Sequence, residues 1–189
     1  MRLRIPTPHA WAETATANLD AFLPDHAANE RKASASALAL VSHYPDRPEL
    51  VARCIALARE ELEHFERVVA LMTARGLRLA PDAKSAYLRG LAAEFRDGSE
   101  PYFLDRLLAA AIAEARGCER FGLLGAALPA GDLRDFYREL ARTEVRHHEM
   151  YLELARKYFP AEQVEPRLEE LLEVEAAIVR SLPVRAALY

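Results

Sequence analysis

Residues 59–68 read REELEHFERV and lie in the middle of a long segment with helical periodicity. The apolar residues on either side fall on one helical stripe, formed by Leu50, Cys54, Leu57, Val68 and Leu71. At the two positions where this stripe would continue, the chain carries Glu61 and His64. Burying a carboxylate and an imidazole is costly unless their polar atoms are compensated. The segment therefore predicts a helix that carries a polar site on its buried face.

The composition favours a helical protein that forms one domain over residues 1–189. Of the 189 residues, 51% are hydrophobic and 29% are charged, as is ordinary for a globular protein. Only seven residues are glycine, and Ala, Leu, Glu and Arg are frequent, which favours helix. No segment of the sequence shows the sustained alternation that is typical of a β-strand.

The sequence also predicts a cellular compartment. No apolar run approaches the length of a membrane span, and no apolar run follows the two early arginines as in a signal peptide. Cys54 and Cys118 lie far apart in helical patterns, which indicates two buried free thiols in a reducing compartment. We therefore expect a cytoplasmic protein without a membrane partner. The net charge of −4 does not by itself suggest a nucleic-acid partner, although a net charge can hide local patches.

Proline and glycine residues divide the chain into helical segments. A short leading helix is expected at 8–20, and a final helical region at 160–181 that is interrupted or recapped at Pro166. Four long helices are expected between them, at 24–43, 46–75, 99–128 and 132–159. Asp46 is expected to cap the second long helix, and Gly76 to end it.

The connections between the long helices predict the fold. Short turns join the first helix to the second and the third to the fourth, whereas residues 77–99 form a long crossover with a short helix near 83–95. A plain up-and-down bundle would have three short turns. We therefore expect an all-α, ferritin-like four-helix bundle with a long crossover and extra terminal helices.

Each long helix carries one glutamate on its apolar stripe. These four residues are Glu30, Glu61, Glu114 and Glu144. Helices 46–75 and 132–159 also carry a histidine three residues later on the same face, namely His64 and His147. Folding the helices at their short turns places Glu30 level with Glu61, and Glu114 level with Glu144. The separation of Glu30 from Glu61 is 31 residues and that of Glu114 from Glu144 is 30, which indicates that the two halves of the chain are related as a repeat.

A layer of four carboxylates and two imidazoles predicts a dinuclear metal centre. The carboxylates would repel one another, and two bound cations would remove that repulsion. This donor set is the one found in ferritin-like di-iron and di-manganese proteins. The alternative, that the acids are solvated or salt-bridged, fits a single Glu-x-x-His motif better than two such motifs on buried stripes. His148 points away from this layer and is expected at the surface or behind the ligands, and His9, His26 and His43 are interpreted as structural.

Neighbouring residues are candidates for supporting the metal centre. Glu60 and Thr143 immediately precede two of the acids, and each either serves a histidine of the opposite helix or faces solvent. Arg146 is a candidate for balancing charge near the metals. Tyr151 is either a core aromatic residue or a hydrogen-bond donor behind the ligands, with the core role favoured.

The sequence resembles a bacterial family of tRNA hydroxylases. The resemblance rests on DHAANERKASASALAL around Glu30, LAREELEHFERV around Glu61, EARGCERFGLL around Glu114 and the Glu-Val-Arg-His group that begins at Glu144. It covers roughly residues 9–160. In larger di-iron hydroxylases an aspartate often precedes the glutamate of that last group, and here Thr143 takes its place. The resemblance implies a di-iron monooxygenase whose metal ligands are Glu30, Glu61, His64, Glu114, Glu144 and His147.

The resemblance also implies the substrate and the partners. It implies hydroxylation of the isopentenyl side chain of 2-methylthio-N6-isopentenyladenosine, beside the anticodon of tRNA, with O2 as co-substrate and electrons from an external partner. Arg134, Arg138 and Arg142 recur every four residues and form a stripe that could follow phosphates. The alternative is a solvated face paired with neighbouring acids. Competing functions are another ferritin-like oxidase or a manganese catalase, since the spacing does not exclude manganese, and a helical interaction module with a buried polar layer.

Overall fold

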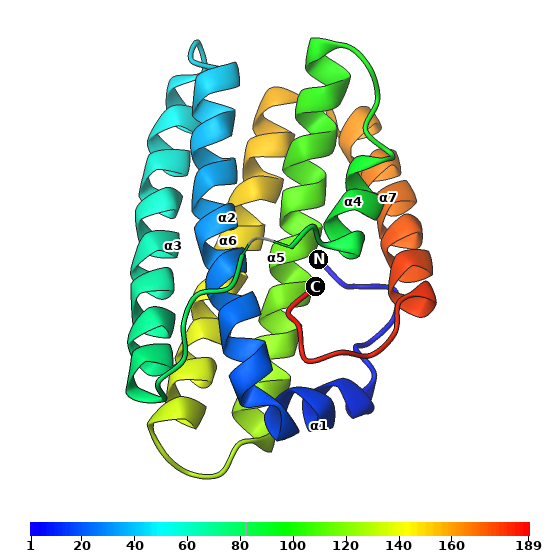
Figure 1. Ribbon diagram of the computed structural model, residues 1–189. Coiled ribbons are helices and arrows are strands. Elements are labelled where there is room, and N and C mark those ends of the chain that lie inside the picture. The colour runs from blue at the N-terminus through cyan, green and yellow to red at the C-terminus, as the bar shows by residue number, and fades with distance from the viewer. Residues whose placement is uncertain (82) are drawn as a thin grey trace. The chain divides into compact units, whose positions relative to one another are not determined.

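The computed structural model describes residues 1–81 and 83–189. Within these ranges the regular secondary structure consists of seven helices and no strand (Figure 1). The helices are α1 (His9–Ala17), α2 (Leu19–His43), α3 (Pro48–Ala74), α4 (Ala86–Ala92), α5 (Ser99–Ala127), α6 (Asp132–Tyr158) and α7 (Ala161–Ser181). None of the described helices combines the length and the apolar character that crossing a membrane requires. The predicted all-α composition is confirmed.

The described residues divide into two compact units. The α2–α3 unit comprises Ala17–Ala83 and Ala186–Leu188, and the α5–α6 unit comprises Met1–Thr16, Lys84–Arg185 and Tyr189. Each unit contains one of the two predicted helical hairpins. The assignment of residues 1–189 to a single domain stays a prediction.

The α2–α3 unit is a helical hairpin whose buried stripes match the predicted ones. α2 and α3 run side by side and are joined by a short turn (Figure 1). The buried stripe residues include Leu23, Ala27, Glu30, Ser34, Ala37, Cys54, Leu57, Glu61, His64 and Val68. The Ser34 hydroxyl donates to the carbonyl of Ala58 at 2.9 Å and links the two helices. The apolar periodicity therefore identified the inner faces correctly.

The C-terminal end of α3 follows the expected glycine signal. Gly76 has a φ of +70°, which only glycine adopts at little cost. Its N–H donates to the carbonyl of Thr73 at 3.0 Å, and the N–H of Leu77 donates to Met72 at 2.9 Å. This pair of bonds is the Schellman motif, which satisfies carbonyls that the helix leaves open. At the other end Arg47, rather than the expected Asp46, is the N-cap residue, because the helix begins at Pro48.

Two prolines lie inside helices that were expected to begin or break there. α2 begins at Leu19 rather than at Pro24, and α7 continues through Pro166 without interruption. Each proline is the sixth residue of its helix, so only one hydrogen bond near the N-terminus is lost. Burial of neighbouring apolar side chains compensates this loss, as with Leu23 beside Pro24 and Leu168 after Pro166.

The α5–α6 unit contains the second hairpin and the remaining helices. The hairpin is close-packed, because a Cβ atom at Gly125 would lie 2.7 Å from Cγ of Arg138. Arg138 Nε donates to the Gly125 carbonyl at 2.9 Å, and Cys118 Sγ donates to the Ala141 carbonyl at 3.2 Å. α4 and α7 pack against each other and against α5 (Figure 1).

A fully buried ion pair ties three helices of this unit together. The guanidinium of Arg116, on α5, binds both carboxylate oxygens of Glu175, on α7, at 2.8 and 3.0 Å. Tyr87, on α4, donates its hydroxyl to the same carboxylate at 3.1 Å. Burial and the Glu175 carboxylate raise the pKa of Tyr87, so the phenol keeps its proton and remains a donor. Arg116 also donates to Thr7 and to the carbonyl of Ile5, which anchors the N-terminal segment.

This ion pair predicts a large loss of stability when one partner is removed. The Glu175→Leu variant leaves the Arg116 guanidinium buried without its main counter-charge, which costs about 3–5 kcal/mol of unfolding free energy. The double variant Arg116→Met with Glu175→Leu should lose much less, because no unpaired charge remains. Urea unfolding of the three proteins measures both effects, and equal stability of the single and double variants would contradict the account.

Candidate metal centre

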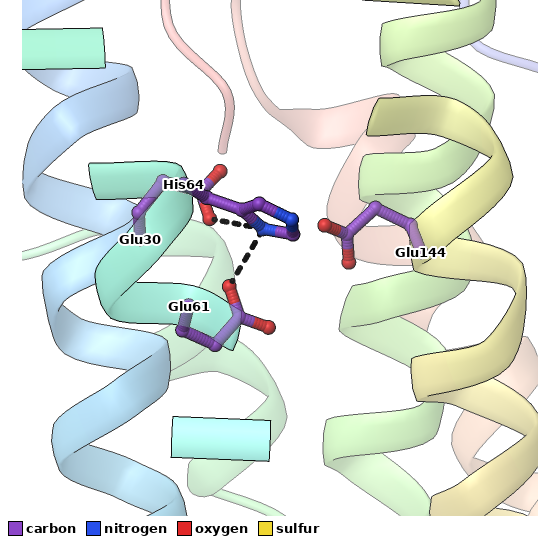
Figure 2. A group of neighbouring side chains, drawn as sticks. All are labelled: Glu30, Glu61, His64 and Glu144. Atoms are coloured by element: carbon purple, nitrogen blue, oxygen red, sulfur yellow. Dashed lines mark ion pairs between the residues drawn. The ribbon is translucent and has the colours of Figure 1, made fainter. Parts of the chain in front are cut away.

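The α2–α3 unit holds the first predicted triad of ligands. Glu30 comes from α2, and Glu61 and His64 come from successive turns of α3. All three are buried, and one ligand atom of each lies within 4.8 Å of those of the other two. Figure 2 shows the His64 imidazole beside both carboxylates, with Nδ1 3.6 Å from Oε2 of Glu30 and 3.5 Å from Oε2 of Glu61. The hairpin therefore brings its three predicted ligands together.

The α5–α6 unit holds the second triad in the same arrangement. Glu114 comes from α5, and Glu144 and His147 come from successive turns of α6. Their ligand atoms also lie within 4.8 Å of one another. His147 Nδ1 is 3.0 Å from Oε2 of Glu144, and both of these residues are buried, whereas Glu114 is half-buried. The sequence repeat is therefore a structural repeat of one acid from the first helix and a Glu-x-x-His pair from the second.

The chemistry of each triad fits a divalent metal. Two carboxylates and one imidazole provide oxygen and nitrogen donors, which suit iron or manganese. Within one hairpin the two acids repel each other while both are ionised, and a bound cation would turn this repulsion into attraction. Two such triads make the buried carboxylate and histidine groups compatible with a site for two metals.

His26 is a buried partner of the triad that the sequence interpretation missed. Its Nε2 lies 2.6 Å from Oε1 of Glu30, and both side chains are buried. The structure thus gives His26 a polar partner among the proposed ligands, whereas the sequence interpretation treated it only as structural. The available signal was its position four residues before Glu30, which places both side chains on one helical face.

His148 is buried, which excludes the surface, the first of its two expected positions. Burial, followed by the nearby N-terminal ammonium group, lowers the pKa of His148. A position behind the ligands, the other alternative, stays a prediction.

Cys118 lies one turn after Glu114 and is half-buried. Burial, with the carboxylates of Glu144, Glu119 and Glu114, raises the pKa of its thiol to about 11. The thiol is therefore protonated at neutral pH, which is not the form that binds metals. Cys54 is buried, and both cysteines are free, as expected.

The other predicted supporting residues have different surroundings. Tyr151 is buried, consistent with the core role. The Thr143 hydroxyl donates to the carbonyl of Glu139 at 3.4 Å within its own helix, and Glu60 is half-buried. Arg146 is exposed. The roles of Glu60, Thr143 and Arg146 at the metal centre stay predictions.

The predicted arginine stripe follows α6 with unequal exposure. Arg142 is exposed, and Arg134 is half-exposed with Nε 3.3 Å from Asp135. Arg138 is also exposed, but its Nε donates a hydrogen bond to the Gly125 carbonyl. All three lie on one helix at a spacing of four residues, so they drift slowly around its surface.

Two helical hairpins, each carrying a buried Glu and a Glu-x-x-His pair, define the class of ferritin-like metal carboxylate proteins. A solved structure supports this class, the "Protein 43 with aldehyde deformylating oxygenase activity from Synechococcus". It is 38% identical in sequence and superposes with a TM-score of 0.93, and the match covers 98% of this chain and 93% of the solved chain. The predicted ferritin-like fold is thereby confirmed. Residues 1–187 match the family described as "tRNA-(MS[2]IO[6]A)-hydroxylase (MiaE)", and the chain belongs to this family.

Two curated relatives agree with that membership. A protein of Pseudomonas putida is 37% identical over 179 residues, which are 95% of this chain and 87% of the relative. A protein of Salmonella typhimurium is 31% identical, with 95% of this chain and 84% of the relative covered. Both are named "tRNA 2-(methylsulfanyl)-N(6)-isopentenyladenosine(37) hydroxylase". The family resemblance expected from the sequence is confirmed.

The buried triads predict that metal binding stabilises the fold. Removing metal with a chelator should lower the melting temperature. A ligand that binds only the folded state, at a free concentration of 100 times its Kd, raises the free energy of unfolding by about 2.7 kcal/mol. The apo form of Glu61→Gln should be more stable than apo wild type, since one buried charge is gone, but should gain less from added metal. Differential scanning calorimetry with and without Fe(II) or Mn(II) measures both effects. A wild-type melting temperature that metal does not change would contradict a buried metal centre.

Proposed function

We propose that this protein is an O2-dependent tRNA hydroxylase that acts on the isopentenyl side chain of 2-methylthio-N6-isopentenyladenosine beside the anticodon. The observation that carries the proposal is the repeated triad of Glu and Glu-x-x-His in a chain that matches the hydroxylase family over residues 1–187. The names of both curated relatives support the same substrate. A tRNA substrate also implies a cytoplasmic location.

The six ligands proposed for the two metals are Glu30, Glu61, His64, Glu114, Glu144 and His147. When bound, two irons supply the chemistry of O2 activation, with electrons from an external donor. The side chains of the protein would hold the metals away from bulk water, since Glu61 and Glu144 are 1% and 2% exposed. Neutral imidazoles and ionised carboxylates are the forms that bind, so metal binding displaces protons.

The competing ferritin-like functions have less support. The solved relative has another oxygenase activity in its title, so the fold alone does not select a substrate. Both curated relatives are named as tRNA hydroxylases rather than as oxidases or catalases. The donor set still suits manganese as well as iron. We therefore propose iron on the basis of the hydroxylase chemistry and not on the geometry of the donors.

The proposed reaction predicts a mass change in one nucleoside. Purified protein with Fe(II), a reductant and O2 should increase the mass of 2-methylthio-N6-isopentenyladenosine in tRNA by one oxygen atom, as seen by nucleoside mass spectrometry. His64→Ala should abolish the product and lower the bound iron. The matched control His43→Ala removes an exposed histidine of the neighbouring helix and should retain both. Unchanged nucleoside with an iron-loaded, folded wild-type protein would refute the proposed substrate.

We propose that the arginine stripe of α6 contributes to tRNA binding. The protein carries a net charge of −4, so its affinity for phosphates must come from a local patch. Arg142 is exposed, and the pair of Arg134 with Asp135 is exposed enough to contribute little to stability. Arg138 donates a hydrogen bond to the Gly125 carbonyl within the hairpin, so changing it would also disturb the packing of α5 and α6. Arg134 and Arg142 are therefore the better residues to change.

Reversing the charge of Arg134 and Arg142 should weaken tRNA binding and leave metal binding intact. If each contacts one phosphate, the slope of log affinity against log salt should fall by about 2. The matched control Arg89→Glu with Arg180→Glu makes the same change of net charge at exposed positions of α4 and α7. Filter binding at several salt concentrations measures the slope. Equal slopes for the two double variants would remove the α6 stripe from the binding surface.

A further inference from the structure

His26 gives the Glu30 carboxylate two different partners. Oε1 of Glu30 lies 2.6 Å from His26 Nε2 on its own helix, and Oε2 lies 3.6 Å from His64 Nδ1. When Glu30 is ionised, as a carboxylate that binds metal is, it can only accept hydrogen bonds, so His26 Nε2 is then the donor. The bond therefore fixes one oxygen and leaves the other directed toward the proposed metal ligand His64.

His26 is placed to act on a ligand and not to be one. Its ring is fully buried and packs against Phe22, with ring centroids 5.7 Å apart. Among the described residues, the group of neighbouring ligand atoms that contains Glu30, Glu61 and His64 does not include His26. A hydrogen bond to a ligating carboxylate orients it and raises metal affinity.

The second half of the repeat has no histidine at the corresponding position. The residue four positions before Glu114 is Ala110, whose side chain cannot donate a hydrogen bond. Glu114 is also half-buried, whereas Glu30 is buried. A contact of the His26 type, between residues four apart on the first helix, is therefore specific to the α2–α3 unit.

We propose that His26 is a positioning residue that fixes the Glu30 carboxylate and tightens metal binding at the triad of the α2–α3 unit. The inference rests on the proposed function, because it requires metal at the two triads. A carboxylate that is already oriented loses less conformational freedom when metal binds. Loss of His26 therefore weakens the α2–α3 position and not the α5–α6 position, which has alanine at the corresponding residue.

Titration of the apo protein with Co(II) tests this role, because the visible absorption of Co(II) reports its ligands. Wild type should bind two Co(II) ions. His26→Leu puts an apolar side chain in place of the imidazole and removes the donor, and it should weaken the binding of one ion by about 10–100-fold while leaving the other unchanged. His26→Gln places an amide nitrogen near the position of Nε2 and should retain most of the affinity. The matched control His43→Leu, on the same helix but exposed, should bind like wild type.

The outcomes separate the inference from the proposed function. Wild type that fails to bind two Co(II) ions overturns the dinuclear centre, and this inference with it. Binding of two Co(II) ions that is unchanged in a folded His26→Leu variant overturns only the role of His26. If His26→Leu does not fold, the comparison of His26→Gln with the shorter His26→Asn decides, since only the longer amide reaches Oε1 of Glu30. Equal affinities of these two variants would then overturn the positioning role.

Discussion

The constraint on which this structure depends is the burial of acids at positions where a helix would normally place apolar residues. In each hairpin two glutamates and one histidine interrupt the apolar stripe, and their ligand atoms lie within 4.8 Å of one another. Uncompensated burial of such charges costs several kcal/mol each. A bound cation would offset that cost, so metal binding to these residues would stabilise the fold.

The other buried acids show what a purely structural solution looks like. Glu175 is paired with Arg116, and Asp105 receives hydrogen bonds from Arg96 and Arg167. Burial alone would raise the pKa of Asp105, but these arginine hydrogen bonds outweigh it and lower the pKa. Glu30, Glu61 and Glu144 instead lie beside imidazoles. Arginine balances the charge of Glu175 and Asp105 within the protein, whereas the acids of the triads have histidine rather than arginine beside them, which is compatible with a metal as their counter-charge.

The sequence predicted local features well because helical periodicity and turn residues are local signals. The inner faces, the Schellman end at Gly76 and both triads follow from spacing alone. The positions of Pro24 and Pro166 inside helices did not, because tertiary burial outweighed the loss of one backbone hydrogen bond. Contacts between distant segments, such as Arg116 with Glu175, leave no periodic signal. His26 had a signal, its spacing from Glu30, but a single histidine on an apolar face is more often structural than functional.

The central claim is that the two triads hold two metal ions. Anomalous X-ray diffraction at the iron absorption edge, from crystals of the iron-loaded protein, tests it most directly. The account predicts two anomalous peaks per chain, one bound by Glu30, Glu61 and His64 and the other by Glu114, Glu144 and His147. A single peak, or peaks away from these six side chains in a fully loaded crystal, would contradict it.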